Sequence, residues 1–446
     1  MTRSIVAVLL GTFTLRFSTG LTGGLLVYYL AELPDYGGPE VSATLVALLT
    51  ATYFAAELIL SPAFGVLSDR YGAHRLMQWG PVFGAVAVVM TALTTNLPLL
   101  GVTRWLEGMA AAASIPSILG YIALATAHDE TLRGRTVSRF EAATLAGIGA
   151  GIVVAGWLYD PDGGLGLRSG AFFLNAGIYV GSLLIYRYGV AELHHGQDPA
   201  ALDHVTPDRE PIPLDSAELR PRHFDLGRYR RLMRAPQVWL LAPTWIALNA
   251  VLGAWTTQSV FQLVREPSEQ FGDQLLMGGF EPVQVSIGLA VAGVIFFAGL
   301  FYWGGRFGTL RRTTIIAVGL AGAVVMVVAV FILNHAIGWG APAQAGLAVT
   351  AACGLFVMAG ATPAALGLLA DISESHPADR GAIMGLYSVF LGLGQIIGAL
   401  ASGSAADLAG IDGLLMASLV LLFIAVVPIH RLRESEHLVG VAPDPA

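Results

Sequence analysis

The sequence predicts an all-α integral membrane protein with twelve transmembrane helices in two pseudo-symmetric six-helix bundles. Three observations support this prediction: the composition, the number of long apolar stretches and the distribution of arginine. Of the 446 residues, 55% are hydrophobic and 12% are charged, and the mean hydropathy is +0.67. A soluble domain carries about 25% charged residues. The chain is therefore expected to reside in a lipid bilayer.

Twelve stretches approach the length of about 20 residues with which an apolar helix crosses a bilayer. They cover residues 4–30, 42–64, 76–97, 99–126, 137–158, 169–188, 236–262, 283–304, 313–334, 342–370, 382–404 and 411–430. The first is longer than the core of a signal peptide, and we predict that it is an uncleaved span. Much of the glycine, 54 residues in all, lies inside these stretches, where small residues let membrane helices approach closely.

Arginine is distributed unevenly between the two sides of this topology. The chain has no lysine, and all 24 basic residues are arginine. With the N-terminus inside, twenty of them fall in cytoplasmic segments, Arg168 and Arg265 fall in outer loops, and Arg16 and Arg104 lie within spans. Basic residues collect on the cytoplasmic side of membrane proteins. We therefore predict a multi-pass protein of the plasma (inner) membrane with both termini cytoplasmic.

The two halves of the chain repeat one another. Four features of the first half recur in the second at one constant offset: Arg133-Gly134, Phe140, Gly147 and Gly151 match Arg380-Gly381, Tyr387, Gly394 and Gly398. We predict a first bundle over residues 1–190, a cytoplasmic linker over 191–235, a second bundle over 236–434 and a cytoplasmic tail over 435–446. Residues 226–234 of the linker form either an amphipathic helix on the membrane surface or a solvated basic flank.

A tight, charged turn connects the second and third spans. Residues 65–75 read G-V-L-S-D-R-Y-G-A-H-R, and this pattern resembles motif A of the major facilitator superfamily of transporters. The resemblance implies a conformational latch of Gly65, Asp69, Arg70, Gly72 and Arg75, in which Asp69 meets the N-terminus of the eleventh helix. The alternative is that these charges only mark the cytoplasmic side. In the second copy of the turn, Gly305 replaces the acid.

Two further patterns place charges inside the first bundle. Arg104-Trp-Leu-Glu107-Gly108 resembles motif B of the same superfamily, with Glu107 in place of the usual glutamine. Glu57 lies about 10 Å into the membrane from the charged turn, in a segment similar to the drug/proton antiporter branch, and Arg16 is its expected partner. Buried acids beside fixed cations suit proton transfer, although static ion pairs would look the same in the sequence.

One departure from the family pattern concerns the fifth span. Proton-linked antiporters of this superfamily carry a motif C that contains a proline, whereas Gly147, Gly151 and Gly156 of this chain surround none. The helix is therefore expected to lack the bend that proline causes. This departure weakens the case for antiport and leaves co-transport open.

The second bundle supplies polar and aromatic candidates for a substrate cavity. Such side chains make an adaptable amphipathic surface. The candidates are Asn249, Trp255, Gln258, Phe356, Met358, Tyr387 and Gln395.

Taken with the resemblance, these features predict a secondary active transporter that exports a small amphipathic organic solute by alternating access, in exchange for protons. The alternatives are a proton-coupled importer or facilitator of a metabolite, and a lipid transporter of the same fold. No nucleotide-binding, metal or catalytic motif was found, so we expect no enzyme activity, no cofactor, no metal and no nucleic-acid partner. The expected partners are the substrate, protons and the bilayer, and the expected state is a monomer.

Overall fold

The structure, a computed structural model, describes residues 3–126, 130–192, 236–266, 269–307, 309–374 and 380–436. The regular elements of these residues are helical. They are α1 (Arg3–Ala31), η1 (Leu33–Tyr36), α2 (Ala43–Tyr71), α3 (Ala73–Leu76), α4 (Trp79–Ala92), α5 (Leu97–Ala125), α6 (Glu130–Tyr159), η2 (Arg168–Gly170), α7 (Ala171–Gly189), α9 (Pro236–Val264), η4 (Glu269–Phe271), α10 (Pro282–Gly304), α11 (Arg312–Asn334), α12 (Ala341–Met358), α13 (Ala361–Glu374), α14 (Arg380–Val426) and α15 (Ile429–Glu436).

Each of the twelve predicted spans corresponds to helix in the structure. Within the described residues, nine helices are long and apolar enough to cross a membrane. One of the nine is the long α14, which contains two helices joined by a kink at Ala409 and Gly410. Two predicted spans are not among the nine: α4, which has only 14 residues, and α9. The predicted span 342–370 is divided into α12 and α13.

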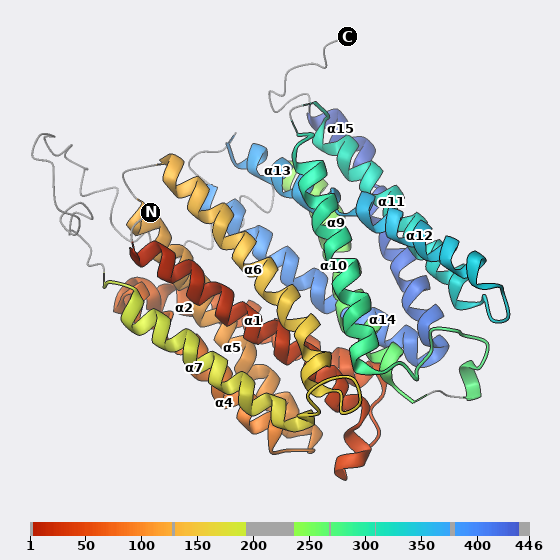
Figure 1. Ribbon diagram of the computed structural model, residues 1–446. Helices are drawn as coiled ribbons and strands as arrows, with labels where there is room; N and C mark the ends of the chain where they lie inside the picture. The colour runs from red at the N-terminus through yellow and green to blue at the C-terminus, as the bar shows by residue number, and fades with distance from the viewer. Residues whose placement is uncertain are drawn as a thin grey trace, which may run out of the picture.

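The helices pack around two main hydrophobic cores. One core is built mainly from α1 to α7, with Tyr28, Tyr121 and Phe172 fully buried in it. The other is built from α9 to α15 around residues such as Trp245 and Leu415. Figure 1 shows the first group in red to yellow on the left and the second in green to blue on the right. The predicted linker helix lies outside the described residues.

The two groups meet through α2 with α14 and through α6 with α10. We call the end of the molecule where α1 begins and α15 lies the terminal end, and the opposite end the distal end (Figure 1). Helix α2 begins at the distal end, where the side chain of Ser42 accepts a hydrogen bond from the Leu45 N–H at 3.2 Å. Helix α10 begins at the same end with a capping box made by Glu281 and Gln284.

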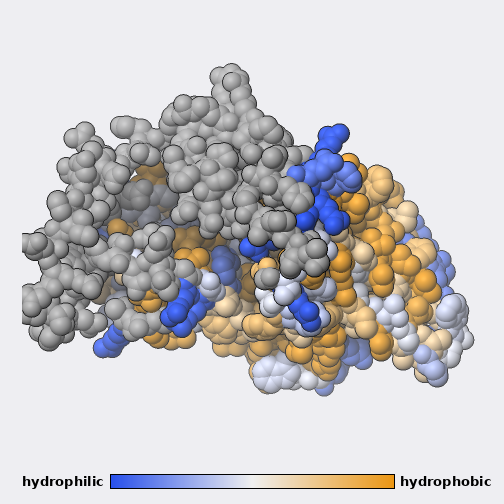
Figure 2. Space-filling view, turned by 90° about the horizontal axis from the view of Figure 1, so that it is seen from above, coloured by the Kyte–Doolittle hydropathy of each residue, from blue (hydrophilic) through white to orange (hydrophobic). Residues whose placement is uncertain are grey.

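The outer surface carries many large apolar side chains. Examples are Phe301, Phe423 and Val294, each more than two-thirds exposed. Figure 2, seen from the terminal end, shows hydrophobic residues over much of the right-hand flank. An apolar flank of this kind would be costly in water and is expected where helices face lipid. The protein is a multi-pass membrane protein.

Candidate functional site

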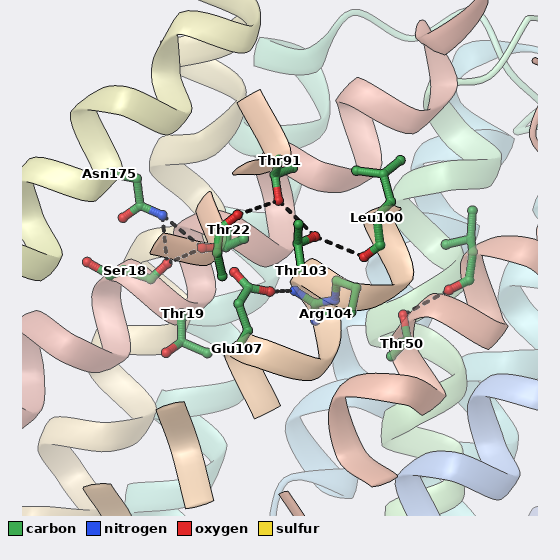
Figure 3. A network of polar contacts seen from close by, with 12 residues as sticks. Ser18, Thr19, Thr22, Thr50, Thr91, Leu100, Thr103, Arg104, Glu107 and Asn175 are labelled. Carbon is green, nitrogen blue, oxygen red and sulfur yellow. Dashed lines mark hydrogen bonds and ion pairs between the residues drawn. The ribbon is translucent and has the colours of Figure 1, made fainter. Parts of the chain in front are cut away.

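The first half of the chain holds a buried pair of opposite charges on α5. The guanidinium of Arg104 contacts the carboxylate of Glu107 directly, and the two residues are only 8% and 4% exposed. Their separation of three residues places both on one face of the helix. Figure 3 shows the pair pointing into the space between α5 and its neighbours. Within the described part of the chain, Arg104 Nε and Glu107 Oε1 have no hydrogen-bond partner.

A glycine brings this pair close to α2. A Cβ atom added to Gly108 would lie 2.6 Å from the Cβ of Ala56 and 3.2 Å from the backbone nitrogen of Glu57. The backbones of α5 and α2 can approach this closely only because Gly108 has no side chain. The guanidinium carbon of Arg104 consequently lies 4.9 Å from the ring centre of Tyr53 on α2. Motif B thus combines a charge pair with the glycine that docks it against α2.

Two carboxylates lie within electrostatic reach of a second cationic group, Arg16 of α1. It interacts electrostatically with Glu57 on α2, the partner expected from the sequence. It also interacts electrostatically with Glu141 on α6, which is not among the residues expected from the sequence. The Arg16 side chain is 8% exposed, whereas Glu57 is partly exposed and Glu141 is exposed. The charge of Arg16 therefore acts on two acids that belong to different helices.

The position of Glu141 follows from the packing of α1 against α6. A Cβ atom on Gly147 would lie 2.9 Å from the Cβ of Arg16. The glycine therefore places Arg16 against α6, the helix that carries Glu141 six residues before Gly147. Glu141 lies inside the predicted fifth span, and charged residues within spans mark functional positions. Its position in the sequence was therefore a signal that could have identified it.

Neutral polar side chains hold the surrounding helices in register. Asn175 on α7 donates hydrogen bonds to the Ser18 carbonyl at 3.1 Å and to the Thr22 hydroxyl at 2.8 Å (Figure 3). The hydroxyl of Thr91 on α4 donates to that of Thr103 on α5 at 3.0 Å. Because these groups are buried with their partners, they tie α7 to α1 and α4 to α5 beside the charged residues.

The second half has an uncharged residue at the place of Arg16. Gly394 of α14 packs on α9 as Gly147 packs on α1, and a Cβ atom on Gly394 would lie 2.7 Å from the Cβ of Asn249. Asn249 is buried, and its side-chain amide donates to the Trp245 carbonyl at 2.9 Å. The pseudo-symmetry of the fold thus relates a charged position in one half to an amide in the other.

The other predicted cavity residues are distributed over several contacts. Trp255 donates to the Ser418 hydroxyl at 3.1 Å, and Gln395 lies beside Gly253. Gln258 is fully buried and donates to the Ala43 carbonyl at 3.0 Å, so its amide joins the two halves. Phe356 and Met358 are partly buried on the last turn of α12, where Phe356 contacts the ring of Tyr302. The side chain of Tyr387 lies outside the described residues.

The charged turn after α2 contacts the segment that follows α7. Gly72 ends α2 with φ +93°, a backbone angle that favours glycine. Arg75 forms an ion pair with Glu192 at 3.1 Å. Arg70 is exposed and Gly65 is partly buried. The structure does not describe the Asp69 side chain or the side chains of residues 381–388, so the predicted latch contact remains a prediction.

Comparisons with known proteins agree with this architecture. The family model of the Major Facilitator Superfamily matches residues 8–373. Two curated relatives are the "Probable actinorhodin transporter" of Streptomyces coelicolor, 30% identical over 177 residues, and the "Quinolone resistance protein NorA" of Staphylococcus aureus, 28% identical over 123 residues. These matches cover 39% and 28% of this chain, and about a third of the length of each relative (30% in both).

Two solved structures share the fold at low sequence identity. The nucleoside transporter NupG superposes with a TM-score of 0.67 at 14% identity, covering 97% of this chain and 99% of that one. A bacterial homologue of the human lysosomal transporter Spinster, in an inward-facing and unoccupied conformation, gives 0.68 at 13% identity, covering 99% and 100%. The family match covers most of the chain, and the two-bundle helical fold agrees with it. The chain belongs to the Major Facilitator Superfamily of transporters.

Proposed function

We propose that this protein exports a small amphipathic organic solute across the plasma membrane in exchange for protons. The observation that carries the proposal is the position of Arg16, which is buried against α6 at Gly147 and whose charge acts on both Glu57 and Glu141. Charged side chains inside a membrane protein are costly unless they are paired or functional. Two curated relatives are named for transport of actinorhodin and for resistance to quinolones, which favours export of organic compounds.

The geometry suggests how a proton controls the first half. Two carboxylates compete for one guanidinium, so a proton on either acid decides which one pairs with Arg16. Glu57 and Glu141 belong to α2 and α6, the two helices of the first half that make its most extensive contacts with the second half. A change of partner at Arg16 therefore acts on the helices that form the interface. A proton can drive alternating access only if protonation is linked to the interface between the two halves, and a change of partner at Arg16 would provide this link.

The Arg104–Glu107 pair provides a second candidate for proton binding. Glu107 keeps one carboxylate oxygen without a protein hydrogen-bond partner among the described residues, although the residue is buried. The backbone approach at Gly108 brings this pair next to Glu57. We propose that the two pairs act as one coupled group, with Arg104 holding Glu107 ionised until a proton arrives.

The arginine distribution supports the proposed orientation, with the terminal end in the cytoplasm. In this orientation Asp69 of the turn after α2 lies at the cytoplasmic surface, where it can latch the inside closed. We also propose the domain limits given above, with bundles over 1–190 and 236–434, and a monomer as the working unit, since one chain contains both bundles.

A second function is favoured by one observation. Helix α6 runs from Glu130 to Tyr159 without the proline that antiporters of the family carry at motif C. Co-transport of a metabolite with protons is therefore the alternative, and nucleosides belong in the test because the fold is shared with a nucleoside transporter.

The purified protein in liposomes that enclose a pH-sensitive dye tests both functions. A proton gradient is imposed, and quinolones, aromatic pigments and nucleosides are added in turn. The proposal expects proton flux that depends on an organic cargo and runs opposite to the cargo. Flux in the same direction as the cargo would establish co-transport instead. Cargo movement without proton flux would show that the buried charges are structural.

A further inference from the structure

At the distal end, Asp407 of α14 holds the beginning of α2. Its two carboxylate oxygens accept hydrogen bonds from the backbone N–H groups of Ala43 at 2.7 Å and Thr44 at 2.9 Å. The first N–H groups of a helix have no partner within the helix and carry the positive end of its dipole. A carboxylate is therefore well suited to bind them, and here it does so from the opposite half of the molecule.

Asp160 makes the corresponding contact on the other side of the interface. Its Oδ2 accepts a hydrogen bond at 3.0 Å from the N–H of Val283, in the first turn of α10. Its Oδ1 accepts from the N–H groups of Asp162 at 2.9 Å and Gly163 at 3.2 Å, which fix the carboxylate in place. Asp160 is completely buried although it lies in a loop after α6. Its carboxylate thus joins the first half to the second.

The two contacts are related by the internal repeat. Asp160 and Asp407 are separated by the same offset as Gly147 and Gly394. Each aspartate follows a glycine four residues earlier, Gly156 or Gly403, at that same offset. Each glycine faces the start of the helix that its aspartate holds. The added Cβ of Gly156 would collide with the Pro282 carbonyl and Ser286, and that of Gly403 with the Ala43 carbonyl and Ala47.

Further contacts close the distal end around these positions. The Tyr28 hydroxyl donates to the Pro282 carbonyl at 3.4 Å, and the amide of Gln258 donates to the Ala43 carbonyl at 3.0 Å. Both contacts join the two halves at the first residue of a helix, α10 or α2. The repeated contacts therefore form two joints of the same design, one on each side of the pseudo-two-fold axis.

The charges around the two joints differ. The carboxylates of Asp160, Asp162 and Glu281 lie within 4.8 Å of one another, and Glu32 interacts with Asp160 electrostatically. Asp407 instead interacts with Arg265. Like charges weaken the first joint and an opposite charge supports the second, so the joint at Asp160 is expected to open more readily.

We propose that Asp160 with Gly156 and Asp407 with Gly403 form two symmetry-related distal clasps, and that both must release before the protein can open at its distal end. The proposal rests on the alternating access proposed above and is independent of the cargo and of proton coupling. The motif G-x-x-x-D supplies both parts of each clasp: the glycine permits close approach, and the carboxylate binds the helix N-terminus.

Distances between spin labels at the distal end test the clasps. All labelled variants carry Cys353→Ser, because Cys353 is the single native cysteine and is exposed. Labels are attached after Leu93→Cys and Ile337→Cys, since both residues are exposed and lie at the distal ends of the first and second halves. Asp160→Asn, Asp407→Asn and the double variant are compared with Asp162→Asn, a control at an exposed neighbour whose replacement leaves the Val283 contact intact.

Each clasp variant is expected to raise the ratio of long to short distances by roughly two- to tenfold, as expected for one carboxylate at a helix N-terminus. The double variant should exceed either single variant, and Asp162→Asn should not lengthen the distance. A folded double variant with an unchanged distance distribution would overturn the proposal. Because the measurement needs neither cargo nor a proton gradient, a loss of proton coupling alone would leave this result intact, and the two proposals can fail separately.

Discussion

Arg104 on α5 lies over the aromatic ring of Tyr53 on α2, with the guanidinium carbon 4.9 Å from the ring centre. The same guanidinium contacts Glu107, so its positive charge is stabilised by a carboxylate and by a ring from a neighbouring helix. This arrangement places a fixed cation at the junction of α2 and α5. Glu57 lies one helical turn after Tyr53 on α2. The charge of Arg104 therefore acts near both Glu107 and Glu57, two of the acids proposed to bind protons.

Replacements of Arg104 and Glu107 are expected to change the free energy of unfolding non-additively. Arg104→Leu should lower the free energy of unfolding by about 3–5 kcal/mol, because it leaves a buried carboxylate without its partner. Arg104→Leu combined with Glu107→Leu should restore most of this loss. Thermal unfolding in detergent, analysed as a double-mutant cycle, measures both effects. A loss in the double variant equal to the sum of the two single losses would show that Arg104 and Glu107 are not coupled.

Gly108 is expected to tolerate no larger residue. Gly108→Val should destabilise the protein by about 1–3 kcal/mol through overpacking against α2, since an added Cβ would already lie 2.6 Å from Ala56. Gly101 on the same helix provides the control, because nothing lies within 4 Å of its added Cβ. Melting temperatures of Gly108→Val and Gly101→Val compare the two sites. Similar losses at both glycines would contradict the close α2–α5 approach.

Cargo-dependent proton flux is expected to require both the positive charge of Arg16 and the length of its side chain. Arg16→Gln should abolish cargo-dependent proton flux, while Arg16→Lys should keep part of it, because a lysine can still pair with one acid. Glu141→Gln should shift the pH dependence of transport, since Glu57 then no longer competes for the guanidinium. Transport rates measured over a range of pH test these variants. A Glu141→Gln profile identical to that of the unaltered protein would remove Glu141 from the coupling group.

The contributions of Asp160 and Glu32 to stability at the distal end should change with pH in opposite directions. Burial alone would raise the pKa of Asp160, but hydrogen bonds from the Val283, Asp162 and Gly163 N–H groups outweigh it and lower the pKa. Its contribution to stability is therefore fully present above the ordinary aspartate pKa of about 3.9 and is lost as the pH falls through the lowered value. Acid should thus release this clasp, and Asp160→Asn should remove the effect.

Glu32 shows the reverse behaviour. Burial raises its pKa, and the nearby Asp160 adds to the rise, whereas a hydrogen bond from Tyr159 and the charge of Arg168 oppose it. Its contribution is present below the ordinary glutamate pKa of about 4.3 and is lost as the pH rises through the raised value. Glu32→Gln should therefore flatten the stability profile on the weakly acidic side. Melting temperatures between about pH 3 and pH 7 separate the two acids by the sign of their slopes.

Much of the fold could be predicted from the sequence because membrane spans have a strong signal. Length and apolarity identify a span without knowledge of its neighbours. The break at Gly360 that divides the tenth span, and the kink at Gly410 inside α14, depend on local backbone geometry and were harder to predict. The direct pairing of Arg104 with Glu107 follows from their spacing on one helix.

The remaining parts of the site depend on contacts between helices. Glu141 lies near the charge of Arg16 because Gly147 docks α6 against α1, a packing that hydropathy does not reveal. Gln258 was selected as a cavity residue from its polarity, whereas its amide bonds the Ala43 carbonyl across the interface. The clasps have a sequence signal, the repeat of Gly156 and Asp160 as Gly403 and Asp407, but its meaning requires the position of the helix starts.

The central claim is that protons and cargo are coupled through the charged groups of the first half. The most direct test compares cargo-dependent proton flux in liposomes between the unaltered protein and the Glu57→Gln, Glu107→Gln double variant. Glu434→Gln, an exposed acid on α15, serves as the control for loss of charge. The account predicts that the double variant loses proton flux while remaining folded and that the control keeps it. Undiminished cargo-dependent proton flux in the double variant would contradict the account.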